Sequence, residues 1–325
     1  MNGHDCFGFV DSIEWASARV HVTGWMLTPG GPADRIVLAT HDQRVLPCSS
    51  VARADLALAF PAIAGAERGG FSVAMDPDEA GDGTKIHHLV AHCDGREVGR
   101  MAIAVPERTA CAPLPPPELR MRVAGSLEPR IFCSSGLWNS AEVVSAASRH
   151  AVPGGFARVL EWGCGCGRMT LHLRRLLRGS DLHAVDTHAP SIEWLQMHSR
   201  EIHVRATSAL PPLPFHDHAF DLVLAASVFP DLTLEAQEVW QAELVRVTAP
   251  AGRIVITTLG PRGAAIVNSP TATVQSPELT RQLWSGGARV LEHAEAVFNR
   301  HHDLWVFAPS PVQGKNPRTI MASES

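Results

Sequence analysis

The chain has 325 residues, a formal net charge of −5, and 45% hydrophobic against 19% charged residues. This composition is typical of globular proteins with sizeable cores and excludes a disordered chain, and the length suggests two domains. No run of lysine and arginine offers a nucleic-acid surface and no apolar run reaches the roughly 20 residues of a membrane span, so we expect neither partner.

The first third of the chain reads as short strands separated by turns. Val20 and Val22 alternate with polar residues, a period of two that predicts a half-buried strand. Further apolar segments of this kind cover residues 35–40, 70–75, 86–93 and 97–105. Asp94-Gly95, between the last two, is typical of a two-residue hairpin turn. These features predict an antiparallel β-sandwich over residues 1–105.

A proline-rich segment separates this part from the rest of the chain. Residues 111–117 read Cys-Ala-Pro-Leu-Pro-Pro-Pro, which does not favour a regular element, so we place a linker at 106–124. Helical sequence follows at 140–150. At the other end, the polar and proline-rich residues 309–325 predict a flexible tail.

The second half of the chain alternates between strand and helix patterns. Strands are predicted at 157–162, 181–186, 220–227, 252–259, 290–298 and 303–308, and helices at 168–178, 191–201 and 234–247. The last helix has one apolar stripe, formed by Ala236, Val239, Trp240, Leu244 and Val247. Alternation of this kind predicts a parallel, doubly wound α/β sheet.

Three glycines at every second position, Gly163, Gly165 and Gly167, stand between a strand and a helix. Glycine allows a tight turn and close approach of a ligand, and the helix start offers free N–H groups. Asp186 ends the next strand, 186 − 163 = 23 residues after the first glycine, near the spacing at which an acid reaches ribose hydroxyls. Together they predict a site for a nucleoside with a carboxylate-bearing tail. The alternative is a structural turn, with Asp186 as a helix cap.

The sequence Leu160-Glu-Trp-Gly-Cys-Gly-Cys-Gly-Arg168 resembles the first motif of class I S-adenosylmethionine (SAM)-dependent methyltransferases. Other stretches are similar to the family's motifs in the right order, at 211–223, 227–229, 240–247 and 302–307. The resemblance spans about 125–308. It implies a Rossmann-like α/β methyltransferase domain with a mostly parallel seven-stranded sheet and SAM as cofactor. More weakly, the β-sandwich is similar to accessory domains that accompany bacterial glycan-modifying enzymes.

The resemblance implies roles for individual residues. Glu161 would lie near the methionine amino group, and Asp186 would hold the ribose hydroxyls. The other cofactor contacts that it implies are Gly163, Cys164, Gly165, Gly167, Thr187, Ser208, Ala209, Ala226 and Ser227. Among them, Ala226 and Ser227 would border the methyl group, whereas Ser208 stands where the family often has aspartate.

Methyl transfer to a hydroxyl or amine often needs a base to take the acceptor's proton. Asp231, just past a predicted strand, stands where the family commonly has histidine and is our first candidate. Aspartate is also a favoured N-cap, so Asp231 could instead begin the helix at 234. His216 is the second candidate. With His218 it offers only two metal ligands, so we expect no metal.

We therefore predict a SAM-dependent methyltransferase that acts on a small-molecule or saccharide acceptor, at oxygen. The alternative is a SAM-binding or partner-binding protein without catalysis, which uses the β-domain for interaction. The seven scattered cysteines favour no disulfide framework, and the first residues show no secretory signal pattern. We expect a bacterial, cytoplasmic protein that can form a homo-oligomer.

Overall fold

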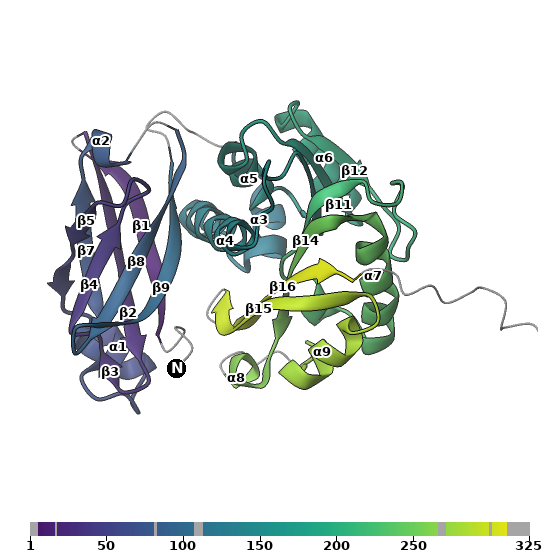
Figure 1. Cartoon of the computed structure of the whole chain (residues 1–325). Coiled ribbons are helices and arrows are strands. Elements are labelled where there is room, and N and C mark those ends of the chain that lie inside the picture. Colours follow the sequence, from purple (N-terminus) through teal and green to yellow (C-terminus); the bar gives the residue numbers. More distant parts are fainter. Residues whose placement is uncertain are drawn as a thin grey trace, which may run out of the picture.

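The computed structural model describes residues 6–16, 18–80, 83–106, 113–265, 271–298 and 301–310. Two parts lie side by side in it, an amino-terminal part made mostly of strands and a carboxyl-terminal part with a sheet between helices (Figure 1). Most of the tail predicted at 309–325 and residues 107–112 of the predicted linker lie outside the described residues.

The amino-terminal part has two antiparallel sheets. One has the order β1-β2-β7-β6, with β3 paired to β2, and the other has the order β5-β4-β8-β9. The strands are β1 (Phe7–Ala16), β2 (Arg19–Thr28), β3 (Gly31–Pro32), β4 (Arg35–Ala39), β5 (Val45–Pro47), β6 (Ser49–Val51), β7 (Gly70–Met75), β8 (Lys85–Cys93) and β9 (Arg96–Val105). Short helices lie in the connections: α1 (Ala54–Ala59), η1 (Ala66–Arg68) and α2 (Pro77–Ala80).

Alternating side chains explain how the two sheets pack. In β2, Val20 and Val22 are buried, whereas the residues before and between them are exposed, as a strand with one buried face requires. Val22 from one sheet and Leu38 and Ile103 from the other belong to the same apolar cluster, so the sheets share one core. The antiparallel all-β organisation predicted from the sequence is confirmed.

The hairpin predicted at Asp94-Gly95 joins β8 to β9. These two residues have φ values of +50° and +71°, in the left-handed region that a two-residue type I′ turn requires at both positions. The Asp94 N–H also donates to Asp34 Oδ2 at 2.8 Å. The local sequence therefore determines this turn, and with it the pairing of the two longest strands of the second sheet.

A seven-stranded sheet lies at the centre of the carboxyl-terminal part, with the order β12-β11-β10-β13-β14-β16-β15. The strands are β10 (Arg158–Trp162), β11 (Asp181–Asp186), β12 (His203–Ala206), β13 (Phe220–Ala225), β14 (Thr248–Leu259), β15 (Ala288–Phe298) and β16 (His302–Pro309). The pairs from β12 to β14 are parallel, and β16 is antiparallel to both of its neighbours. The mostly parallel, seven-stranded sheet is thus confirmed.

Helices cover both faces of this sheet (Figure 1). They are α3 (Pro117–Ala124), α4 (Pro129–Arg149), α5 (Thr170–Leu176), α6 (Ala189–His198), η2 (Phe229–Asp231), α7 (Leu234–Val247), α8 (Pro261–Ala264) and α9 (Pro277–Trp284). Val159 and Leu224 pack with α4, α5 and α6 on one face, and Leu160 and Val223 pack with α7 and α9 on the other. Successive residues are therefore buried at 159–162 of β10 and at 222–225 of β13, which explains the nearly continuous apolar strands.

Helix α4 joins the two parts of the chain. Its Trp138 is 1% exposed and belongs to the core of the β-sheets, where the ring lies edge-on to Phe9 with centroids 5.3 Å apart. Val143 and Val144 of the same helix belong to the core of the α/β part. One helix thus contributes to both cores, and the domain boundaries at 105 and 124 stay a prediction.

We expect Trp138→Ala to lower the free energy of unfolding by about 3–5 kcal/mol, because it leaves a large cavity where the two cores meet. Chemical denaturation followed by circular dichroism measures this change. Leu58→Ala is the control, since Leu58 is 85% exposed, and its effect should stay within about 0.5 kcal/mol. A loss at Trp138 no larger than the control's would contradict a shared core.

Two segments differ from the expectations above. Helix α3 lies inside the predicted linker. The prolines there do not prevent a helix, because Pro117 occupies its first turn, where a missing N–H costs no hydrogen bond. In α7, Val239 is 50% exposed, so the predicted apolar stripe is not buried along its whole length. Gln237 is buried on that helix instead, and its amide donates to Phe229 O at 2.9 Å. Within the described ranges, no helix is both long and apolar enough to span a bilayer.

Candidate functional site

The glycine loop connects the end of β10 to α5. Gly163, Gly165 and Gly167 have φ values of +81°, +54° and +87°, a region that residues with a side chain rarely adopt. A Cβ atom at these positions would also collide with Val228, Val123 and Leu195, respectively. Backbone conformation and close packing therefore both require glycine here, as the spacing in the sequence predicted.

Asp186, at the end of β11, fixes the conformation of this loop. Parallel pairing with β10 brings the two strand ends together. One carboxylate oxygen of Asp186 accepts the Gly165 N–H at 2.7 Å, and the other accepts the His188 N–H at 2.8 Å. The Gly163 N–H donates to Val185 O at 2.8 Å. The carboxylate thus orients the loop, in addition to any contact that it makes with a ligand.

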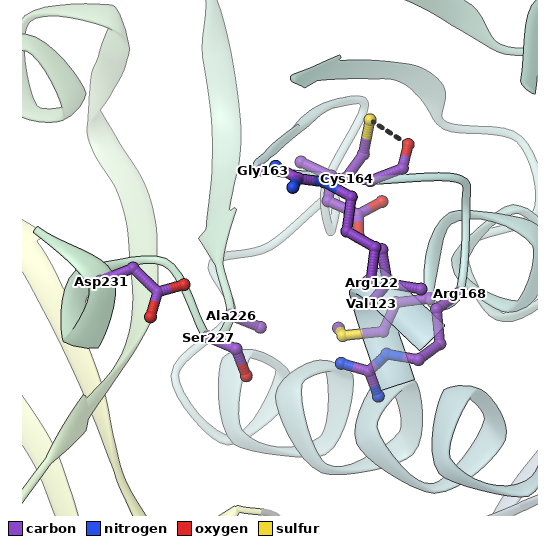
Figure 2. A pocket seen from close by; sticks show the side chains of 11 residues that line it. Arg122, Val123, Gly163, Cys164, Arg168, Ala226, Ser227 and Asp231 are labelled. Atoms are coloured by element: carbon purple, nitrogen blue, oxygen red, sulfur yellow. Dashed lines mark hydrogen bonds between the residues drawn. The ribbon is translucent and has the colours of Figure 1, made fainter. Parts of the chain in front are cut away.

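A cavity of about 300 Å³ opens beside the loop, at the carboxyl ends of β10 and β13. Its lining residues are Arg122, Val123, Glu161, Gly163, Cys164, Gly165, Arg168, Met169, Ala226, Ser227 and Asp231. In Figure 2, Asp231 lies on one side and Arg122 and Arg168 on the other, with Ser227 between them. This is the edge of an open α/β sheet at which ligands bind.

Glu161 contributes a buried carboxyl group to the cavity. It is 4% exposed, and its Oε2 atom has no hydrogen-bond partner among the described residues. Burial raises the pKa of Glu161 to about 7, although the Thr170 hydroxyl and the Arg168 charge act in the opposite direction. A buried acceptor without a partner is costly unless a ligand satisfies it. The position therefore suits a cationic donor such as an ammonium group.

Two guanidinium groups line the same cavity, although neither arginine was predicted as a site residue. Arg168 closes the glycine loop and is 8% exposed, and burial lowers its pKa to about 10, so the group stays charged at neutral pH. Arg122 comes from α3. Guanidinium groups bind carboxylates in a planar, bidentate geometry. One acid and two arginines in one cavity thus provide partners for both ends of a zwitterion.

Ser227 lies at the end of β13 in a strained conformation. Its φ is +58°, which for a residue with a side chain is uncommon and clusters at functional sites. Its N–H donates to Thr257 Oγ1 at 2.7 Å, and its Oγ lies 3.4 Å from His302 Nδ1. Burial lowers the pKa of His302 to about 3. A neutral imidazole therefore lies behind Ser227, and it comes from a segment 75 residues further along the chain.

Asp231 is in η2 on the far side of the cavity from the arginines. Burial raises the pKa of its carboxyl group, while the charge of Arg122 lowers it. The alternative assignment of Asp231 as the N-cap of α7 is wrong, because Thr233 is the N-cap and its side chain accepts the Ala236 N–H at 3.3 Å. Asp231 thus has no capping role and faces the cavity.

The other predicted cofactor residues lie beyond the cavity lining. Asp186 O accepts the Thr207 N–H at 2.9 Å, so Asp186 with Thr187 and the segment before Ser208 lie at neighbouring strand ends. Ser208 is exposed and its hydroxyl donates to Leu210 O at 2.9 Å. Ala209 O accepts the Trp240 Nε1–H at 3.3 Å. A nucleoside role for Thr187, Ser208 and Ala209 stays a prediction.

His216 does not reach the cavity. It is exposed and precedes the start of β13, whereas the cavity lies beyond that strand's end. The neighbouring Asp217 pairs with Arg246 at 2.7 Å, next to the start of β14. The structure therefore corrects the placement of His216 as a candidate base, because the amino and carboxyl ends of a strand are separated by the strand's length.

Cys164 and Cys166 of the loop are buried among apolar residues. Burial raises the pKa of the Cys164 thiol well above its usual value and that of Cys166 to about 12. Thiols held in the neutral form are poor nucleophiles. Both cysteines therefore fill space beside the glycines, and no disulfide joins the cysteines in the part of the chain that the structure describes.

Comparisons with known proteins agree with this geometry. Residues 160–256 match the family model described as "Methyltransferase domain". A malonyl-[acyl-carrier protein] O-methyltransferase from Halorhodospira halophila is 36% identical over 109 residues, which are 32% of this chain and 35% of that protein. The match thus spans about a third of the length of this curated relative.

Solved structures are similar at lower sequence identity. The PH0226 protein from Pyrococcus horikoshii OT3 is 18% identical, with a TM-score of 0.44, 52% of this chain covered and 89% of that chain. The N-methyltransferase NodS from Bradyrhizobium japonicum WM9, solved in complex with S-adenosyl-L-homocysteine (SAH), is 20% identical, with a TM-score of 0.41 and coverage of 52% and 87%.

The family match begins within β10 and ends within β14. It therefore includes the glycine loop, Asp186, Ser227 and Asp231, which surround the cavity and its edge. Beyond the matched residues, β16 and β15 continue the same sheet next to β14. The matched residues 160–256 of this chain are therefore part of a class I, SAM-dependent methyltransferase domain.

Proposed function

We propose that this protein transfers a methyl group from SAM to an oxygen atom of a small-molecule or saccharide acceptor. The observation that carries the proposal is the buried, unpartnered Glu161 carboxyl group in one cavity with Arg122 and Arg168. SAM has an α-amino group and a carboxylate at one end, and these are the groups that the three side chains suit. The glycine loop supplies the adjoining surface.

The cavity residues divide between binding and orientation. Glu161 would accept hydrogen bonds from the α-amino group, and Arg168, with Arg122 beside it, would bind the carboxylate. Asp186, Thr187, Ser208 and Ala209 would receive the nucleoside along the neighbouring strand ends, and Ala226 and Ser227 would border the reactive centre. When bound, SAM supplies an electrophilic methyl group on sulfur, so the protein's part is chiefly alignment and exclusion of water.

On the acceptor side, the candidate base is Asp231. Asp231 lines the cavity together with Ser227, and it does not cap α7. A carboxylate within reach of a hydroxyl can take the proton that the acceptor loses on methylation. The name of the Halorhodospira relative specifies methyl transfer to oxygen, which supports oxygen as the acceptor atom here. A net charge of −5 argues against a nucleic-acid acceptor.

The proposal is tested with the purified full-length chain, SAM and a panel of hydroxylated small molecules and saccharides, with SAH formation as the readout. We expect turnover that depends on both the acceptor and the enzyme. Tight binding of SAM without turnover on any acceptor would favour the non-catalytic alternative. Absence of both binding and turnover would overturn the proposal.

We also propose that the protein acts in the cytoplasm as a bacterial enzyme, and that it can form a homo-oligomer.

A further inference from the structure

Three potential metal ligands lie together at the amino-terminal ends of β11 and β12, whereas the glycine loop adjoins the carboxyl ends of the strands. Asp181 is the first residue of β11, and His183, two positions later, points to the same face. His203 begins the neighbouring strand β12 and is the direct cross-strand partner of His183. The register of two parallel strands therefore places the carboxylate and both imidazoles on one face, with little freedom of the backbone.

The distances between the ligand atoms are short. His183 Nε2 lies 3.1 Å from Asp181 Oδ2, and His203 Nε2 lies 3.0 Å from Asp181 Oδ1. The two imidazole rings stack with their centroids 4.7 Å apart and their planes at 25°. One ligand atom from each residue lies within 4.8 Å of the other two. Tetrahedral zinc, with bonds of about 2.0–2.2 Å, separates its ligand atoms by roughly 3.4 Å, so small side-chain rotations suffice.

We propose that Asp181, His183 and His203 form a binding site for a divalent transition-metal ion, with zinc as the ion that their chemistry suits best. Two imidazoles and one carboxylate are a ligand set that zinc accepts, with water in the fourth position. Water has access, because the side chains of Asp181 and His203 are 42% and 68% exposed. The site uses none of the residues of the proposed methyl-transfer cavity.

A metal ion here would stabilise the edge of the sheet. Strand β12 is the outermost strand of the sheet and has four residues, so it has few backbone hydrogen bonds to hold it. Coordination by His203 would tie it to β11. One charge opposes binding: Arg158 Nε lies 3.6 Å from Asp181 Oδ2. We therefore expect Arg158→Gln to bind the metal more tightly than the natural sequence does.

Calorimetric titration of the full-length chain with zinc chloride near neutral pH tests the site directly. We expect one zinc ion per chain and a higher melting temperature with the ion present. His203→Ala removes one ligand, and because His203 is exposed, this variant should keep its fold. It should weaken zinc binding by at least about tenfold and abolish the rise in melting temperature. His21→Ala is the matched control, because His21 is an exposed strand histidine outside the cluster.

The outcomes separate cleanly. Stoichiometric binding that His203→Ala and Asp181→Asn weaken and His21→Ala leaves intact supports the site. Absence of saturable binding overturns it. Binding that is equally strong in His203→Ala also overturns it, because the ion would then be bound elsewhere, for example at the cysteines. Neither outcome depends on finding a methyl acceptor.

Discussion

Glu161→Gln is expected to weaken SAM binding by at least about tenfold and to leave the fold intact. The two side chains have the same shape, but the amide lacks the charge that an ammonium group requires. Losing one partner of a buried, charge-assisted hydrogen bond costs about 2–5 kcal/mol, which corresponds to more than a tenfold change in affinity. Calorimetric titration of both proteins with SAM and SAH measures the change.

The effect of pH distinguishes a binding role of Glu161 from a merely structural one. Burial holds the pKa of the Glu161 carboxyl group at about 7 in the free protein, and the ammonium group binds the ionised form. Affinity for SAM should therefore rise as the pH increases through about 7, until the α-amino group of SAM itself loses its proton near pH 8. Glu161→Gln should remove the rising limb. An unchanged affinity and pH profile in this variant would contradict the assignment.

Asp231→Asn is expected to lower kcat by about 10²–10⁴-fold, the usual contribution of a general base, and to leave the dissociation constant for SAM nearly unchanged. The substitution keeps the shape of the side chain and disturbs no helix cap, since Thr233 caps α7. Single-turnover kinetics with an acceptor from the hydroxyl panel measures the chemical step separately from binding.

A pH profile and a control complete the Asp231 experiment. A base acts in its ionised form, so kcat should rise with pH through the pKa of Asp231, which burial raises above its ordinary value. The asparagine variant should lack this rise. His216→Ala is the control and should behave like the natural sequence, because His216 lies at the other edge of the sheet. A kcat for Asp231→Asn close to that of the natural sequence would assign proton removal to another group.

Local sequence patterns predicted most of the fold and the glycine loop beside the cavity. The glycine loop and Asp186 lie within one strand-helix-strand unit, so their spacing reports their proximity. The Asp94-Gly95 turn was predictable from the sequence because its residue types match the φ values that the turn requires. The apolar strands of the second half were readable because both of their faces are buried.

The other residues of the cavity lining and its surroundings were less accessible to sequence analysis, because they come from distant segments. Arg122 and Val123 lie on α3, which a run of prolines concealed, although a proline at the first turn of a helix is itself a signal of a helix start. His302 approaches Ser227 only because β16 inserts between β14 and β15, a pairing that no local pattern determines. His216 was wrongly favoured because closeness to β13 in sequence does not tell which end of the strand a residue adjoins.

Calorimetry with three ligands tests most directly whether the cavity recognises the amino-acid end of SAM. Purified full-length protein is titrated with SAM, with SAH and with 5′-methylthioadenosine, which has the nucleoside and sulfur but no amino or carboxylate group. We predict one binding site per chain for SAM and SAH, and an affinity for methylthioadenosine at least about tenfold lower, because Glu161 and Arg168 then have no partner. Equal affinities for all three ligands, or no binding of SAM and SAH, would contradict recognition of the amino-acid end of SAM by this cavity.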